Sequence, residues 1–260
     1  MLKATDIYLS RRGAAILSDV QLLLLSGQVM VILGPNGSGK TSLLNVLTGE
    51  LTSDRGDVFF QERPMAQWPA GGLAQRLAIL PQHSTLNFPF TVEEVVMLGR
   101  SAHSSGHQRD REIVAAALQM VDSSYLSKRF YTQLSGGEKQ RVQLARVLAQ
   151  IWDEPEDSDT KNGRCLILDE PTSSFDLSHR QLMVDVIRHF SGQGVGILMV
   201  SHDLNLATQL ADQIMLLSCG EVAAQGDVEQ VMTPEILQRV FRAKIDVIAN
   251  PSNGQKLIVY

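Results

Sequence analysis

Short runs of apolar residues recur along the chain, and each is closed by a glycine, a proline or a polar residue. They lie at 29–33, 77–80, 165–168, 196–200 and 214–217. Apolar runs of this length with such ends are typical of buried β-strands. Segments with helical spacing of apolar residues follow several of them, at 42–48, 178–190 and 204–211. The alternation predicts an α/β fold.

Two stretches near the start of the chain alternate more loosely between apolar and polar residues. They cover 3–9 and 15–25 and flank a turn at Arg11-Arg12-Gly13, and 56–60 adds another short strand. We expect these segments to form β-strands. At the other end, 245–248 and 256–260 surround a sequence rich in turn-forming residues, which predicts a C-terminal hairpin extension within 241–260.

The stretch at about 85–135 differs from the rest because its pattern is helical. Thr91 and Glu94 have the spacing of a capping box, in which each side chain bonds the other residue's backbone N–H and a helix begins. Apolar residues then repeat at helical spacing at Ile113, Ala117, Leu118 and Val121. We interpret this stretch as a helical subdomain inserted into a single domain that spans 1–260.

Two further helix starts are marked by their capping residues. Ser135 and Glu138 form a second capping box, and apolar residues continue at helical spacing to Leu148. Thr233-Pro234 predicts a short helix, because proline is favoured at the first helical position.

A glycine-rich loop between the strand at 29–33 and the helix at 42–48 reads G-x-x-x-x-G-K-T. The backbone N–H groups of such a P-loop and the positive end of the helix dipole converge on a phosphate. Lys40 would reach the β- and γ-phosphates, and the Thr41 hydroxyl would bind Mg²⁺. The alternative is a glycine-rich turn with a surface lysine. The predicted ATP-binding residues of the loop are Gly34, Pro35, Asn36, Gly37, Ser38, Gly39, Lys40, Thr41 and Ser42.

Four polar residues follow other predicted strands and suit the remaining chemistry of phosphoryl transfer. Asp169 is the expected Mg²⁺ ligand and Glu170 the general base or water-orienting group. Gln82 would bind ATP and ligate Mg²⁺, and His202 would bond the γ-phosphate as a second catalytic residue. The alternatives are an acidic pair that caps a turn, a surface glutamine and a structural histidine.

The composition excludes some classes of protein but does not indicate a reaction. The chain has 260 residues, of which 44% are hydrophobic and 20% charged, with a formal net charge of −5. These values are ordinary for a globular domain with a sizeable core. No strongly basic stretch indicates nucleic acid as a partner. No apolar run has the length of a bilayer span and no signal peptide opens the chain, so any membrane role is expected to act through a partner.

The two cysteines and a pair of histidines raise the question of a metal site. Cys165 and Cys219 lack metal-site spacing and border apolar strands, so we expect buried thiols in a reducing compartment. His103 and His107 have a metal-like spacing, but their segment is polar and loop-like. We therefore expect no metal or heme site there.

The sequence Leu134-Ser135-Gly136-Gly137-Glu138-Lys139-Gln140-Arg141 resembles the signature motif of the ATP-binding-cassette (ABC) ATPases. The order of motifs is similar to the full set of that family: P-loop, Gln82, signature, Asp169-Glu170, Ser173-Ser174-Phe175-Asp176 and His202. The resemblance covers essentially the whole chain, and the combination is far more specific than any single motif. It implies an ATPase with a P-loop NTPase core, an antiparallel β subdomain and an inserted α-helical subdomain.

The resemblance also implies a homodimer. Members of the family pair head to tail with two ATP molecules between them. Leu134, Ser135, Gly136, Gly137 and Glu138 would lie at a helix N-terminus that faces the ATP of the opposite chain. Asp176 and its neighbours would line the dimer interface. Hydrolysis would remove the shared γ-phosphate contacts and let the dimer open.

One position departs from the family pattern. An aromatic residue before the first turn usually stacks on adenine, whereas this chain has Arg11-Arg12 there, with Tyr8 slightly upstream. A guanidinium can also stack on a base, so the mode of adenine binding stays open.

Particular segments resemble a narrower group of importers. The sequence 82–100, which contains Phe88-Pro89-Phe90, resembles importers of iron complexes and cobalamin. The polar insertion 151–164 and the Arg11-Arg12-Gly13 turn resemble those of hemin-import ATP-binding proteins. This resemblance implies a peripheral subunit on the cytoplasmic face of the inner membrane. It would drive hemin import through polytopic permease subunits, with a substrate-binding protein acting indirectly.

Two other functions fit the same motifs. The first is the ATPase of a ferric-siderophore or cobalamin importer. The second is a soluble ABC ATPase in iron–sulfur cluster assembly. The partner distinguishes the transport functions from the soluble one, because a pull-down in detergent would recover either a polytopic membrane protein or a soluble protein.

Overall fold

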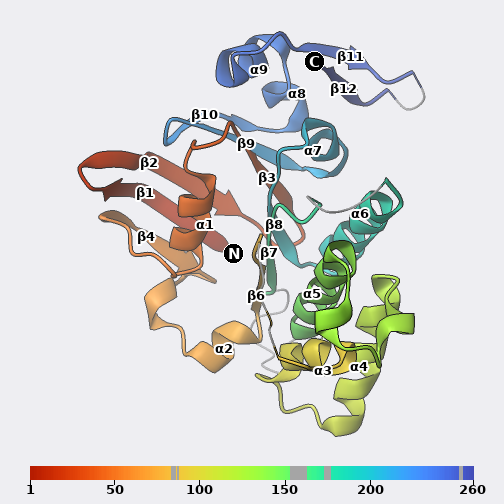
Figure 1. Cartoon of the computed structure of the whole chain (residues 1–260). Helices are drawn as coiled ribbons and strands as arrows, with labels where there is room; N and C mark the ends of the chain where they lie inside the picture. Colours follow the sequence, from red (N-terminus) through yellow and green to blue (C-terminus); the bar gives the residue numbers. More distant parts are fainter. Residues whose placement is uncertain (83–85, 87, 153–162, 173–176, 252–253) are drawn as a thin grey trace. The chain divides into compact units, whose positions relative to one another are not determined.

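The computed structural model describes residues 1–82, 86, 88–152, 163–172, 177–251 and 254–260. These residues form two compact units. The first consists of 1–68 together with 196–260, and the second of 69–195. Most helices and strands of each unit are labelled in Figure 1.

The first unit contains an antiparallel sheet with the strand order β2-β1-β4-β5. Its strands are β1 (Leu2–Arg11), β2 (Ala14–Leu24), β4 (Arg55–Phe60) and β5 (Arg63–Pro64). Alternate side chains of β1 are buried, but Asp6 has a φ of 51° at a register shift between β1 and β2. Such an irregularity explains why the sequence alternates only loosely. The predicted antiparallel subdomain is confirmed.

The same unit contains strands in the order β10-β9-β3-β8. They are β3 (Val29–Leu33), β8 (Gly196–Val200), β9 (Gln213–Ser218) and β10 (Glu221–Gly226). β3 runs parallel to β8 and β9, and every residue of β3 and β8 is buried. Continuous apolar runs are typical of parallel strands, because both faces of such a sheet are covered. The helices α1 (Lys40–Leu47) and α7 (Leu204–Leu210) follow β3 and β8 in the chain.

The last residues of the chain complete this unit. Helix α8 (Val228–Val231) precedes α9 (Pro234–Phe241), which is capped by Thr233 as predicted. The strands β11 (Asp246–Ala249) and β12 (Lys256–Val259) pair antiparallel and confirm the predicted hairpin. The side-chain amide of Asn205 on α7 bonds both backbone groups of Ile258, so the hairpin is anchored to α7.

The second unit combines two parallel strands with most of the helices. β6 (Leu77–Leu80) pairs with β7 (Cys165–Asp169). Figure 1 shows α3, α4 and α5 of this unit side by side. Both predicted capping boxes are present, at the start of α3 and of α5. The helical elements are α2 (Ala70–Ala74), α3 (Val92–Met97), η2 (Leu98–Arg100), α4 (His107–Met120), η3 (Ser124–Leu126), η4 (Tyr131–Gln133), α5 (Gly136–Gln150) and α6 (Leu177–Gly192).

The two cysteines have different environments, so the expectation of two buried thiols is wrong for one of them. Cys165 is buried in β7, whereas Cys219 is exposed. β9 ends at Ser218, and Cys219 begins the tight turn to β10. Cys219 has a φ of 51° and Gly220 a φ of 81°, as in two-residue hairpin turns with positive φ at both positions. A turn at the tip of a hairpin leaves its side chains in solvent.

Among the described helices, none is both long enough and apolar enough to cross a lipid bilayer.

Candidate functional site

The loop between β3 and α1 has a shape that requires glycine at two positions. A Cβ atom on Gly34 would lie 2.1 Å from the carbonyl oxygen of Leu217, closer than real Cβ contacts allow. At Gly39 it would lie 2.9 Å from the carbonyl oxygen of Ile16, and Gly39 has a φ of 103°. A side chain at either position would push the loop away from the strands beneath it.

The loop gathers donors for an anion. Lys40 is only 6% exposed, and its Nζ donates to the carbonyl oxygens of Gly34 and Pro35, both at 2.9 Å. α1 begins at Lys40 with no side-chain cap and no acidic residue in its first turn. The buried Ser38 Oγ has no hydrogen-bond partner within the described part of the chain. An ammonium group, a helix N-terminus and an unsatisfied hydroxyl fit a phosphate group.

The β9–β10 turn is hydrogen-bonded to this loop. Gly220 N donates to the Ser38 carbonyl at 3.0 Å, and Ser18 N donates to the Gly220 carbonyl at 2.9 Å. This contact was not predicted from the sequence. The only signal for it is the Cys219-Gly220 pair, which marks a turn but not what the turn touches.

His202 follows the strand next to the loop. β3 and β8 are parallel and in register at Ile32 and Val200, and Ser201 N donates to the Ile32 carbonyl at 3.2 Å. The first unit therefore places His202 and the P-loop after the carboxyl ends of neighbouring strands, and His202 is exposed. Ligands of open α/β sheets bind at such strand ends.

The second unit brings together the other three predicted residues. β6 and β7 are parallel and in register at Leu80 and Leu168, so Gln82 and Glu170 follow neighbouring strand ends. Gln82 Nε2 donates to Glu170 Oε2 at 2.7 Å. Asp169 is 9% exposed at the end of β7. Glu170 has a φ of 48°, which turns the backbone out of the strand direction at that residue.

The signature residues surround the start of α5. Ser135 Oγ accepts from Glu138 N at 3.4 Å, and Glu138 Oε2 accepts from Ser135 N at 2.8 Å and from Ser135 Oγ at 2.7 Å. These bonds to the Ser135 side chain and backbone hold the pKa of Glu138 below its ordinary value. Leu134 is buried beneath this turn, and Gly136 and Gly137 open the helix. The N-terminus of α5 is thus fixed by its own capping box.

Sequence reasoning missed Gln140, one turn further along α5. Its Nε2 donates to the carbonyl oxygen of Pro171 at 2.7 Å, directly after Glu170. The signature helix is therefore joined to the turn that bears Glu170. A glutamine on a helix gives no sequence signal for such a bond, because its partner lies 31 residues away.

Some predicted residues cannot be placed. Ser173, Ser174, Phe175 and Asp176 lie outside the described residues, as does 153–162 of the polar insertion. The structure does describe the residues found where an aromatic residue was expected to stack on adenine. Arg11 ends β1, Arg12 occupies the turn with a φ of 51°, and Tyr8 is 37% exposed.

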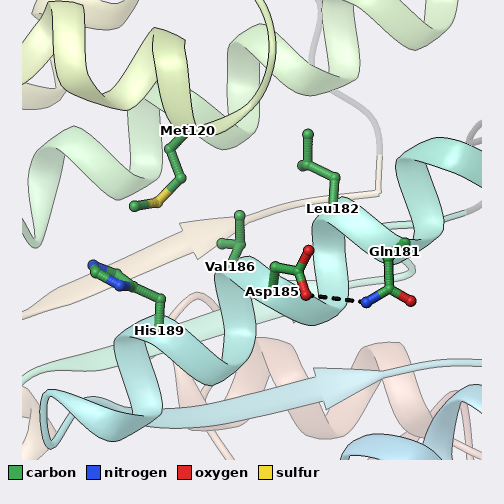
Figure 2. Close-up of a pocket in the computed structure, with 6 residues that line it drawn as sticks. All are labelled: Met120, Gln181, Leu182, Asp185, Val186 and His189. Carbon is green, nitrogen blue, oxygen red and sulfur yellow. Dashed lines mark hydrogen bonds between the residues drawn. The ribbon is translucent and has the colours of Figure 1, made fainter.

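A separate pocket of about 450 Å³ in the second unit is lined by one face of α6 and by Met120. Figure 2 shows Gln181, Asp185 and His189 along this helix, with a hydrogen bond of 3.0 Å from Gln181 Nε2 to Asp185 Oδ1. Its lining consists of Met120, Gln181, Leu182, Asp185, Val186 and His189, and it includes none of the predicted site residues. The candidate functional residues therefore lie in the strand-end cluster of each unit and at the N-terminus of α5, and not in this pocket.

Comparison with known families identifies the family to which these motifs belong. The sequence profile of the ABC transporter family matches residues 17–173. The chain belongs to this family. As an ABC transporter ATPase it binds ATP, and its hydrolysis of ATP is coupled to transport. The recognition of the family from its motifs is confirmed.

The similarity to individual relatives extends over the whole chain. A hemin import ATP-binding protein of Pseudomonas putida is 47% identical over 259 residues, which cover 100% of this chain and 99% of the relative. One from Pseudomonas aeruginosa is 45% identical with the same coverage. One from Gloeobacter violaceus is 45% identical over 100% of this chain and 94% of the relative.

Solved structures show the same fold at lower identity. The ATP-binding subunit of an ABC transporter matches with a TM-score of 0.78 and 21% identity, and covers 94% of each chain. A dimeric bacterial ABC transporter cassette matches with a TM-score of 0.76 and 23% identity, over 88% of this chain and 99% of that one. The predicted fold class, an α/β ABC ATPase with antiparallel β strands and helical insertions, is confirmed.

Proposed function

We propose that this chain is the ATP-hydrolysing subunit of a hemin importer. The observation that carries the proposal is the 47% identity, over the full length of both chains, to a hemin import ATP-binding protein. The P-loop supports it, since its donors suit a triphosphate.

The proposed roles of the individual residues follow from their chemistry. The P-loop residues Gly34 to Ser42 hold the phosphates, with Lys40 as the cation. The oxygen donors Thr41, Gln82 and Asp169 suit Mg²⁺, which prefers oxygen ligands and, when bound, neutralises charge on the β- and γ-phosphate oxygens. Glu170 acts as the general base that takes a proton from the attacking water, and His202 donates to the γ-phosphate.

The signature residues act on a second copy of the chain in this proposal. Leu134 to Glu138 would present the N-terminus of α5 to the ATP bound by the partner in a homodimer. The α5 capping box supports this role, because it fixes the helix start while Ser135 and Gly136 stay exposed. The homodimer would sit at the cytoplasmic face of the inner membrane on polytopic permease subunits, with a substrate-binding protein acting only through them.

The test is growth of the source cell with the Lys40→Ala variant, with hemin, a ferric siderophore or inorganic iron as the sole iron source. Loss of growth on hemin alone is the expected result. Loss on siderophore with intact growth on hemin would assign the chain to a siderophore importer. Growth like that of the wild type on every source would contradict the importer function. A detergent pull-down that recovers a soluble assembly instead of a polytopic protein would favour the iron–sulfur alternative.

A further inference from the structure

A single side chain of α7 is hydrogen-bonded to the last strand of the chain. Asn205 lies in the first turn of α7. Its Nδ2 donates to the Ile258 carbonyl oxygen at 3.1 Å, and its Oδ1 accepts from Ile258 N at 2.8 Å. One amide side chain therefore satisfies both backbone groups of Ile258, which is only 3% exposed. Asn205 thus takes the place that a neighbouring strand would have at the edge of β12.

The hairpin contacts the side of α7 that is turned away from the core. Leu206, Ala207 and Leu210 are buried on one side of this helix, whereas Asn205 and Thr208 are half-buried on the other. α7 has only seven residues, and helices this short depend on contacts with the rest of the fold. Figure 1 shows the hairpin of β11 and β12 next to α7. The helix is therefore supported on both sides within the first unit.

The hairpin is also fixed to α8. Lys256 Nζ donates to the carbonyl oxygens of Glu229 at 2.9 Å and Met232 at 3.1 Å, and it pairs with the Glu229 carboxylate at 3.1 Å. α8 follows β10, and the β9–β10 turn contains Gly220, whose N–H is bonded to the P-loop. β12 therefore joins α7 to the part of the first unit that supports the P-loop.

His202 comes directly before the helix that the hairpin holds. Ser201 N donates to the backbone of β3 at 3.2 Å. Asp203 is the N-cap of α7, and its Oδ1 accepts from Leu206 N at 2.9 Å. His202 lies between these two attachments. Its position is therefore set by β3 on one side and, on the other, by the first turn of α7, which contains Asn205.

We propose that Asn205 is a positioning residue for ATP hydrolysis, because it holds α7, and with α7 His202, against the C-terminal hairpin. The inference rests on the proposed function, in which His202 donates to the γ-phosphate. The side-chain bonds of Asn205 go to Ile258 and not to the P-loop, which binds the phosphates. Loss of these bonds therefore slows hydrolysis and leaves ATP binding nearly unchanged.

The first experiment compares kcat and KM for ATP in two variants of the full chain. Asn205→Ala removes both bonds to the hairpin. Thr208→Ala is the matched control, because Thr208 Oγ1 donates to the Asn205 carbonyl within the same helix at 2.8 Å. We expect N205A to lower kcat about three- to thirtyfold with KM within about twofold, and T208A to stay within about twofold of the wild type. A kcat of N205A equal to that of the wild type would overturn the proposal.

A double-mutant cycle with His202→Ala tests whether Asn205 acts through this residue. A positioning role predicts that N205A has no further effect on the single-turnover rate once His202 is alanine. A merely structural role would lower the rate by the same factor in both backgrounds, and that result would overturn the proposal. An H202A rate like that of the wild type would instead overturn the proposed role of His202, so the two failures are distinguishable.

A further measurement needs no variant. Ile258 N points away from β11 toward Asn205, and the partner of Ile258 across the hairpin is Val247. Both residues of such a pair direct their N–H groups outward, and among the described residues no second strand pairs with β11. We expect amide hydrogen exchange in the wild type to be at least about tenfold slower at Ile258 than at Val247. Equal rates would show that Asn205 does not hold the hairpin and would overturn the proposal.

Discussion

Gln82 donates a hydrogen bond to Glu170 at 2.7 Å, across 88 residues of sequence. The two residues meet because β6 and β7 are parallel and in register, which brings their carboxyl ends together. A hydrogen bond from a neutral amide fixes the orientation of a carboxylate without neutralising it. A group proposed to take a proton from water benefits from a fixed orientation.

Replacement of Gln82 by alanine should therefore slow hydrolysis. Hydrogen bonds to charged groups contribute about 1.5–3 kcal/mol, so we expect kcat to fall by about one to two orders of magnitude. The steady-state ATPase rate measures this. Gln75→Ala is the control, because its amide bonds the Ala102 carbonyl on the same unit. Equal rates for both variants would contradict a role for the Gln82–Glu170 bond.

Glu170→Gln should separate binding from chemistry. The amide keeps the shape of the side chain but cannot accept the proton of water. A general base contributes about 10²- to 10⁴-fold, so we expect turnover to fall by that factor while ATP binding persists and dimers accumulate. Single-turnover kinetics and size-exclusion chromatography with ATP measure the two effects. Glu112→Gln on the exposed face of α4 is the control, and unchanged turnover in E170Q would remove Glu170 from the base role.

The capping box of α5 should make stability depend on pH in acid. The pKa of Glu138 lies below its ordinary value of 4.5, because of bonds from Ser135. The charged carboxylate therefore stabilises the fold above pH 4.5, and this contribution is lost as the pH falls through the lowered pKa. Glu138→Gln keeps a capping side chain without a titrating proton.

The difference in urea midpoint between wild type and E138Q is the measurement for this prediction. It should shift in favour of E138Q as the pH falls below about 4.5, and stay constant above it. The same series with E112Q is expected to show a smaller shift. A difference between wild type and E138Q that does not change with pH would show that the Ser135 bonds do not stabilise the charged form.

The two thiols should react at very different rates. Burial raises the pKa of the Cys165 thiol to about 12, whereas Cys219 is exposed in the β9–β10 turn. The thiolate is the reactive form, so a native chain at neutral pH should label at Cys219 within minutes and at Cys165 only after unfolding. Mass spectrometry after labelling with and without denaturant checks this. Rapid labelling of Cys165 in the native chain would contradict its burial.

A feature of this structure could be predicted from the sequence where the residues that interact lie close together in the chain. The strands 77–80 and 196–200 were predicted with their observed bounds, because each is a continuous apolar run followed by a proline or a polar residue. The capping boxes were found because each closes within four residues. β10 was not predicted, since Glu221–Gly226 contains only one large apolar residue, Val222, and its place is set by pairing with β9.

For the site, too, local spacing could be predicted from the sequence and contacts between distant residues could not. Spacing within one motif predicted the P-loop and the start of α5. The hydrogen bonds of Gln140 and Asn205 could not be predicted, because their partners on the turn and on β12 lie 31 and 53 residues away. The exposure of Cys219 depended on whether β9 ends one residue earlier or later, and strand ends are set by pairing and not by hydrophobicity alone.

The first unit is built from two distant parts of the chain, and the ribosome makes these parts at different times. The P-loop lies in 1–68, but its brace at Gly220 and the strands on both sides of β3 belong to 196–260. A ribosome must therefore translate all of 69–195 before the loop gains its supports. At about 5–20 residues per second this delay is on the order of 10 s. The second unit is continuous in sequence, so all of it, the signature helix included, is synthesised before the supports of the P-loop.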